Sequence, residues 1–181
     1  MRRLVTIAVC AALSLTLASC PSRAQTSSTR LLPGRVCLMY APVPVIGHVG
    51  WAVRAENGLW YGGGTDPSNR WFQPMRNWIA GPYSFRRLLA TFHGQNPISA
   101  YRSFRCRSVR SRGSLAALAE FRSVARWPYD VVSSNCLTRS IRTLKAYSGD
   151  LSEMPSGIAQ RPSDYYHRTL TVIGWENSRN W

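Results

Sequence analysis

After residue 33, the first half of the chain carries short, strand-like runs of apolar residues, whereas the second half has helical periodicity. Alternation with a period of two indicates strands, and apolar residues three and four apart indicate helices. The predicted strands lie near 35–40, 47–54, 59–63 and 101–109, and the predicted helices near 114–126 and from Cys136 to 147. This order is typical of an α+β domain with an antiparallel sheet packed against helices.

Two segments lack a clear period. Residues 66–98 are expected to form a long irregular segment that rims a cleft. Residues 152–181, which contain Pro155, Gly157 and Pro162, are expected to close the domain as a strap.

The first 24 residues have the layout of a secretion signal: a basic start, an apolar run over 4–17 and then small residues. The apolar run is shorter than the roughly 20 residues that a membrane-spanning helix needs. The run LASC at 17–20 resembles the lipobox of bacterial lipoproteins, which predicts acylation of Cys20. Cleavage after Ala24 is the alternative and would release a soluble protein. The protein is therefore expected to be exported. It would be periplasmic or anchored in a membrane as a lipoprotein, and secretion is the alternative.

Residues 25–33 are rich in Ser and Thr and predict a flexible linker, which leaves 34–181 as a single domain. The chain has 23 Lys and Arg against 8 Asp and Glu, and without Arg2 and Arg3 its net charge is +13. Such an excess attracts polyanions, which outside the cytoplasm are wall polymers and lipid head groups. The excess of basic residues is also explained by a GC-rich genome, in which codon usage favours arginine. No nucleic-acid, metal or cofactor motif is recognised, so none of these ligands is expected, and the oligomeric state stays open.

Three cysteines remain in the expected domain, an odd number for an oxidising compartment. Cys37 and Cys106 lie in two predicted strands and are favoured as a disulfide pair, which leaves Cys136 as the free thiol. Asn135 or Ser134 can cap the helix that follows, so Cys136 falls in its first turn. Unpaired amides and the helix dipole favour a thiolate there, and the Cys136 amide offers a donor to an oxyanion. A small buried residue or half of a disulfide is the alternative.

A nucleophilic cysteine needs an imidazole, and His48 is the best candidate of the three histidines. His48 shares a strand face with the small residues Gly50 and Ala52, a face that suits an imidazole opposite a helix. His93 lies in a predicted loop and His167 near the end of the chain.

A histidine strand followed later by a helix that opens with Asn135 and Cys136 resembles the circularly permuted NlpC-like cysteine hydrolases. These are papain-related and include the lecithin:retinol acyltransferase type. The segment from Tyr129 to Cys136 fits the family's form of a Tyr, a few residues and then Asn-Cys. The resemblance covers about residues 35–149 and implies a permuted papain-like domain with a Cys-His site. Such families add a third polar residue that orients the imidazole.

A two-residue turn at Asn57 and Gly58 would set His48 opposite Pro67, with Asp66 beside it. Asp66 is then the one ionisable candidate for the third residue, and a turn cap is its alternative role. The acyltransferase branch uses a second histidine here, which this chain lacks.

These features lead to three hypotheses. The first is an exported thiol hydrolase, an amidase or peptidase that cleaves an envelope substrate such as peptidoglycan peptides. The second is a lipid acyltransferase or acylhydrolase. The third is a non-catalytic envelope-binding module or hydrolase inhibitor, which predicts that Cys136 is disulfide-bonded or buried and far from His48.

Overall fold

The structure is a computed structural model that describes residues 33–69, 74–110 and 113–181. Leu31–Trp181 form one compact unit. The expected signal segment, Cys20 and almost all of the expected linker lie outside the described residues. Within those residues, no helix is long and apolar enough to span a bilayer.

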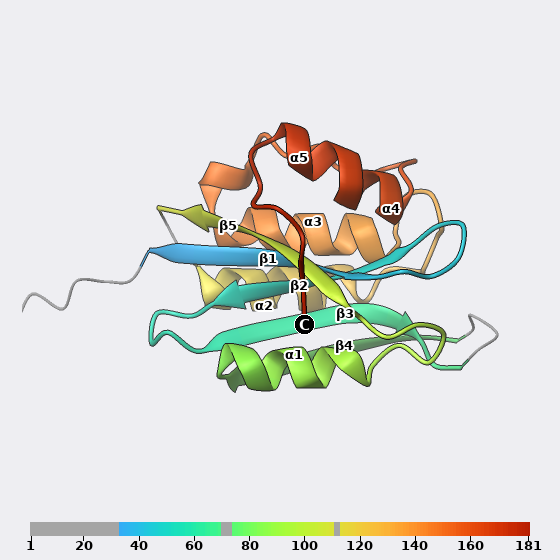
Figure 1. Cartoon of the computed structure of the whole chain (residues 1–181), viewed down its shortest axis with the longest axis horizontal. Coiled ribbons are helices and arrows are strands. Elements are labelled where there is room, and N and C mark those ends of the chain that lie inside the picture. The colour runs from blue at the N-terminus through green and yellow to red at the C-terminus, as the bar shows by residue number, and fades with distance from the viewer. Residues whose placement is uncertain (1–32, 70–73, 111–112) are drawn as a thin grey trace, which may run out of the picture. The chain divides into compact units, whose positions relative to one another are not determined.

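An antiparallel sheet with the strand order β4-β3-β2-β1-β5-β6 forms the centre of the described chain (Figure 1). Its strands are β1 (Gly34–Ala41), β2 (His48–Arg54), β3 (Trp60–Pro67), β4 (Met75–Tyr83), β5 (Ser103–Val109) and β6 (Arg179–Asn180). Helices pack on this sheet, which confirms the predicted α+β class.

Strand β1 lies in the middle of the sheet and pairs with both β2 and β5. Its register sets Cys37 directly opposite Cys106, and the two form a disulfide. Cys136 is the free cysteine among the described residues. The structure therefore joins the pair that the sequence favours and leaves the third thiol unbridged.

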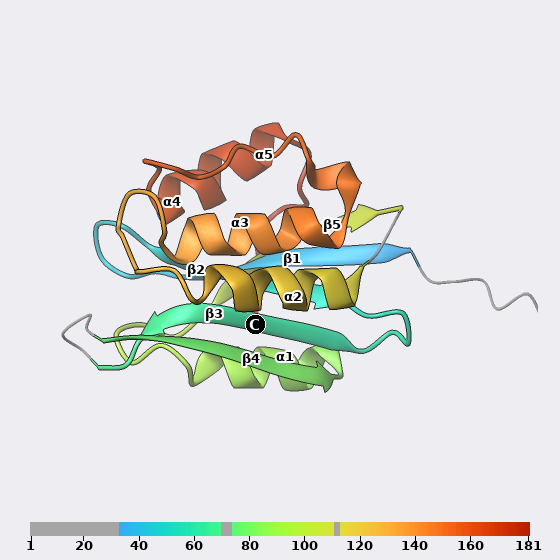
Figure 2. The same cartoon turned by 180° about the vertical axis from the view of Figure 1, so that it is seen from behind.

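Helices cover the two faces of the sheet. Helices α2 (Ser114–Val124) and α3 (Cys136–Tyr147) pack on one face, where Trp51 of β2 meets Phe121 of α2 with ring centroids 5.1 Å apart. Helix α1 (Phe85–His93) packs on the other face. Figure 1 shows α1 in front of the sheet, and the reverse view in Figure 2 brings α2 to the front. Successive side chains of β2 point to opposite faces of the sheet and thus belong to two separate apolar cores.

The expectation of an irregular segment over 66–98 is wrong, because this segment contains β4 and α1. Strand β4 is an edge strand, paired only with β3, and half of it faces solvent, so its sequence lacks the apolar run of a central strand. Pro82 is compatible with this edge position. Helix α1 is capped by Ser84 and buries only Leu88 and Phe92, a narrow stripe in a short helix.

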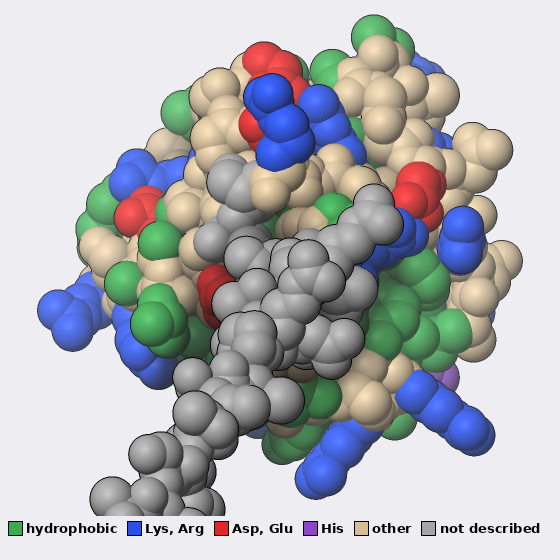
Figure 3. All heavy atoms as spheres, turned by 90° about the vertical axis from the view of Figure 1, so that its left-hand side faces the viewer, with side chains coloured by type: hydrophobic (Ala, Val, Ile, Leu, Met, Phe, Trp, Pro, Cys, Tyr) green, Lys and Arg blue, Asp and Glu red, His purple; other side chains and the backbone are tan. Residues whose placement is uncertain are grey.

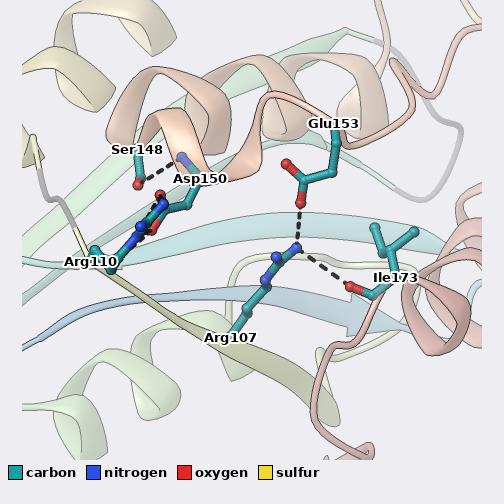
Figure 4. A network of polar contacts seen from close by, with 6 residues as sticks. All are labelled: Arg107, Arg110, Ser148, Asp150, Glu153 and Ile173. Carbon is teal, nitrogen blue, oxygen red and sulfur yellow. Dashed lines mark hydrogen bonds and ion pairs between the residues drawn. The ribbon is translucent and has the colours of Figure 1, made fainter.

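The closing segment is more structured than a strap. The one-turn helix η1 (Gly149–Leu151) precedes it. Residues 152–181 contain a continuous helical stretch of α4 (Pro162–Asp164), the π-helical η2 (Tyr165–Thr169) and α5 (Leu170–Val172), and then β6. Figure 4 shows how ion pairs attach this part of the chain to the end of β5. Arg110 pairs with Asp150 at 3.0 Å, and Arg107 pairs with Glu153 at 2.7 Å while also reaching the Ile173 carbonyl. Arg107 of β5 and Arg110 just after it thus bind residues that follow α3.

Candidate functional site

Helix α3 begins at Cys136, as the sequence predicts, and Asn135 is its cap. The Asn135 side chain accepts hydrogen bonds from the amides of Leu137 and Thr138, and the Thr138 hydroxyl accepts one from the Asn135 amide. This reciprocal capping box satisfies the first amides of the helix and fixes where it starts. The Cys136 residue is unbridged and 4% exposed.

The register between β2 and β3 differs from the expectation. Gly50 pairs with Gly64, and extending this register places His48 opposite Asp66 rather than Pro67. The turn has three residues between Ala55 and Leu59, whose amide and carbonyl bond at 2.7 Å. A loop longer by one residue moves the pairing by one position, which brings Asp66 directly to His48.

His48 and Asp66 form a buried ion pair in which Nε2 lies 2.6 Å from Oδ1. Their side chains are 7% and 0% exposed. The Nε2–H bond does not point straight at the carboxylate, so the contact is an ion pair rather than a well-aligned hydrogen bond. Since Asp66 occupies Nε2, Nδ1 is the ring nitrogen left for other partners.

The Cys136 thiol is a hydrogen-bonding partner of the His48 ring. Burial disfavours the charged imidazole, but the Cys136 charge and the Asp66 carboxylate outweigh it and raise the pKa of His48 to about 10. The imidazole is therefore protonated at neutral pH. Cys136, His48 and Asp66 form one continuous chain of contacts, here called the Cys-His-Asp cluster.

His48 reaches Cys136 by a route that the sequence did not predict. The expectation that the small-residue face of β2 meets the cysteine helix is wrong, because a Cβ added to Gly50 would lie 2.7 Å from Phe92 of α1. The small residues make room for α1 on the face opposite α3. His48 and Cys136 meet because each is the first residue of its element, at the same end of the sheet.

Two aromatic side chains complete the surroundings of Asp66. The Tyr101 hydroxyl donates to Oδ1 at 2.9 Å, and the Trp78 indole Nε1–H donates to Oδ2. Tyr101 is fully buried, and burial together with the Asp66 charge raises its pKa well above the usual value, so it stays a donor. Sequence reasoning missed both residues, since Trp78 lies in the segment taken as irregular and Tyr101 at the edge of a predicted strand.

Tyr129 interacts with Cys136 as well. The Cys136 amide N–H donates to the Tyr129 hydroxyl. Burial, followed by the Cys136 charge, raises the pKa of Tyr129, so its phenol remains protonated at neutral pH. In this structure the Tyr129 oxygen therefore takes up the Cys136 amide, and the amide can donate to an oxyanion only when this contact opens.

A buried arginine supports the loop before Cys136. Arg139, 2% exposed, donates to the Ser134 hydroxyl, to Asn77 Oδ1 at 3.0 Å and to the Trp127 carbonyl at 2.7 Å. These acceptors are all neutral. Burial lowers the pKa of Arg139, and the charges of Tyr129 and Cys136 oppose this shift. Arg139 therefore brings a positive charge to the cluster while joining the loop to β4.

Within the described residues, no group of His, Cys, Asp and Glu side chains is arranged to hold a metal ion. A hollow of about 360 Å³ lies between β4 and α2 and is lined by Asn77, Trp78, Ile79, Phe121, Arg122, Ala125 and Arg126. Asn77 and Trp78 connect this hollow with Arg139 and Asp66. It thus adjoins the Cys-His-Asp cluster without containing it.

Comparison of the chain with known protein families, with curated proteins and with solved structures finds no match.

Proposed function

We propose that the protein is an exported cysteine hydrolase whose nucleophile is Cys136. The contact chain from Cys136 through His48 to Asp66 carries this proposal, because it unites a nucleophile, a proton carrier and an orienting carboxylate. A raised His48 pKa fits a thiolate–imidazolium pair, the reactive state of a cysteine nucleophile.

In the proposed reaction, the Cys136 thiolate attacks the carbonyl carbon of an amide or ester, and the carbonyl electrons move to its oxygen. The Cys136 amide, once it leaves the Tyr129 oxygen, and the Tyr129 phenol donate hydrogen bonds to this oxyanion. The intermediate collapses to a thioester as His48 gives its proton to the leaving group. His48 then takes a proton from water, which attacks the thioester, and the acid and the thiolate are released.

Asp66 orients His48 in this scheme. The carboxylate contacts Nε2, which leaves Nδ1 for the thiol, and it favours the charged imidazolium of the resting thiolate–imidazolium pair. Tyr101 and Trp78 hold Asp66 in turn.

The order of elements supports a permuted papain-like arrangement as the finer description of the fold. The histidine strand β2 comes first, and the cysteine helix α3 follows later. This is the order that the resemblance to NlpC-like hydrolases implies.

The substrate class follows from the expected export signal and the basic charge. An exported domain meets envelope substrates, so peptidoglycan peptides are the first proposed substrate and lipid esters or amides the second. Either substrate supplies the carbonyl carbon that Cys136 attacks.

A second function, that of a non-catalytic envelope-binding module or hydrolase inhibitor, is favoured by one observation. Cys136 is only 4% exposed, so a substrate needs the neighbouring loops to move before it reaches the sulfur. The proximity of His48 and the free thiol favour the hydrolase.

Thiol labelling separates the two functions. The native protein is treated with iodoacetamide, and Cys136→Ala, His48→Ala and Asp164→Asn are compared with the wild type. We expect fast labelling of one thiol, its loss in Cys136→Ala, much slower labelling in His48→Ala and no change at the exposed Asp164. Labelling that is no faster than that of a free cysteine, or that His48→Ala leaves unchanged, would rule out the hydrolase.

A further inference from the structure

Five aliphatic side chains are exposed on loops at the end of the sheet that carries the Cys-His-Asp cluster. Their exposed fractions are far above those of core residues: Val45 81%, Ile46 43%, Val131 76%, Val132 50% and Ile158 53%. We call this set the apolar rim. Water-exposed aliphatic side chains gathered at one place mark an interaction surface, whereas single ones do not.

Backbone hydrogen bonds hold the three loops of the apolar rim together. The Ala159 amide donates to the Val132 carbonyl at 3.1 Å, and the Ser163 amide donates to the Ile46 carbonyl at 3.0 Å. Figures 1 and 2 both show the loops before β2 and α3 and the one before α4 at the same end of the domain. His48 follows the first loop directly, and Cys136 follows the second. The apolar rim therefore surrounds the approach to the cluster.

Val45 adds a second observation. Its φ is +72°, in the left-handed region that a β-branched residue rarely adopts. A strained backbone is kept only where surrounding structure imposes it, and such residues concentrate at functional sites. The strained residue presents an apolar side chain to water. Asn or Gly at this position would relieve the backbone strain without the loss of any contact in the core.

We propose that the apolar rim docks the protein on a membrane surface that carries anionic lipid head groups, with its aliphatic side chains inserted at the boundary of the acyl chains. Burial of these side chains in lipid removes apolar area from water, which is favourable. The rim consists of loop tips, a shape suited to penetrating a soft surface rather than to filling a rigid groove.

Charge complementarity points to the same occupant. The chain carries 23 Lys and Arg against 8 Asp and Glu, and Arg161 is exposed in the loop that carries Ile158. Basic side chains are drawn to anionic head groups. Figure 3, which shows the end opposite the rim, has basic side chains distributed around the surface rather than in one patch. The charge attracts the whole domain, and the apolar rim determines which end meets the membrane.

This orientation turns the Cys-His-Asp cluster toward the bilayer. The docking surface itself does not depend on the reactivity of Cys136. Both properties are therefore testable in one set of proteins.

Vesicle co-sedimentation tests the docking. The form that begins at Gln25 contains the whole compact unit and lacks Cys20, so lipidation does not contribute. The vesicles are phosphatidylcholine alone, or phosphatidylcholine with roughly one-third phosphatidylglycerol. The rim variants are Val131→Ser/Val132→Ser and Val45→Asn/Ile158→Ser, and thermal melts confirm that each is folded. The matched control is Leu115→Ser/Val172→Ser, which removes two aliphatic side chains that are 77% and 85% exposed outside the rim.

We expect the wild type and the control to bind the anionic vesicles, and each rim variant to bind about tenfold more weakly. Equal binding by all four proteins would assign any attraction to charge alone and overturn the proposal. So would a wild type that binds no vesicles, including one that instead self-associates through the rim in light scattering. Cys136→Ala should bind like the wild type. Vesicle binding without thiol labelling would refute only the hydrolase, and labelling without vesicle binding would refute only the docking.

Discussion

The imidazole of His48 and the carboxylate of Asp66 lie 2.6 Å apart on adjacent strands, and neither side chain is more than 7% exposed. A buried ion pair is costly unless each member is well satisfied. Here Asp66 also accepts bonds from Tyr101 and Trp78, and His48 also faces Cys136. The pair is thus the middle of a longer polar chain, and its members are expected to act as a unit.

The first prediction concerns pH. The His48 pKa is raised from 6.5 to about 10 in the folded state, so His48 stabilises the fold fully below pH 6.5 and loses this contribution as the pH rises toward 10. The difference in urea midpoint between the wild type and His48→Gln should shrink over that window. In NMR titrations His48 should stay protonated above neutral pH, and its pKa should fall in Cys136→Ala.

His167 is an internal reference for the same titration, because burial, then Arg105, lowers its pKa. The two rings should shift in opposite directions from 6.5. A His48 ring that titrates at 6.5 in the wild type would contradict the ion pair.

The second prediction concerns Asp66→Asn. The amide keeps the size of the carboxylate but removes the charge that favours the imidazolium. Removing one member of a buried pair costs about 3–5 kcal/mol of stability. Thiol labelling and any hydrolysis should fall by about 100-fold or more. Asp164→Asn, which alters an exposed pair at 3.9 Å, should leave both unchanged. Unaltered labelling in Asp66→Asn would remove Asp66 from the proposed mechanism.

The third prediction separates the charge of Arg139 from its hydrogen bonds. Arg139→Lys keeps the charge but loses the fork that reaches Ser134, Asn77 and Trp127, whereas Arg139→Met loses both. In both variants the free energy of unfolding, measured in urea, should fall by about 2–4 kcal/mol, because buried acceptors are left unpaired. Labelling of Cys136 at a fixed pH should be slower in the Met variant than in the Lys variant. Equal rates would show that the charge has no influence on the thiol.

The fourth prediction concerns the glycine run of β3. A Cβ on Gly63 would lie 2.5 Å from the Trp78 carbonyl oxygen and 2.7 Å from the Trp51 ring. Neither neighbour can move freely, so Gly63→Ala should lower the free energy of unfolding by about 2–3 kcal/mol and weaken the contact of Trp78 with Asp66. Gly94→Ala, where a Cβ would meet nothing within 4 Å, should stay within about 0.5 kcal/mol of the wild type. Circular dichroism melts of the two variants decide the matter.

Local signals account for what the sequence predicted well. The helix from Cys136 to Tyr147 has the predicted bounds because a cap and an apolar stripe are encoded within one segment. Strands β1, β2 and β5 lie near their predicted ranges, since each carries a buried run. Strand β4 and helix α1 were missed because one is a partly exposed edge and the other buries only two residues.

The sequence by itself determined the α+β class, the start of the cysteine helix, and the choice of Cys136 and His48, because capping, periodicity and residue counts are properties of short segments. The tertiary structure decided the register that sets Asp66 beside His48, and the positions of Tyr101, Trp78, Tyr129 and Arg139 around them. These depend on a single residue in a turn and on packing between distant segments, and neither is encoded in a local pattern.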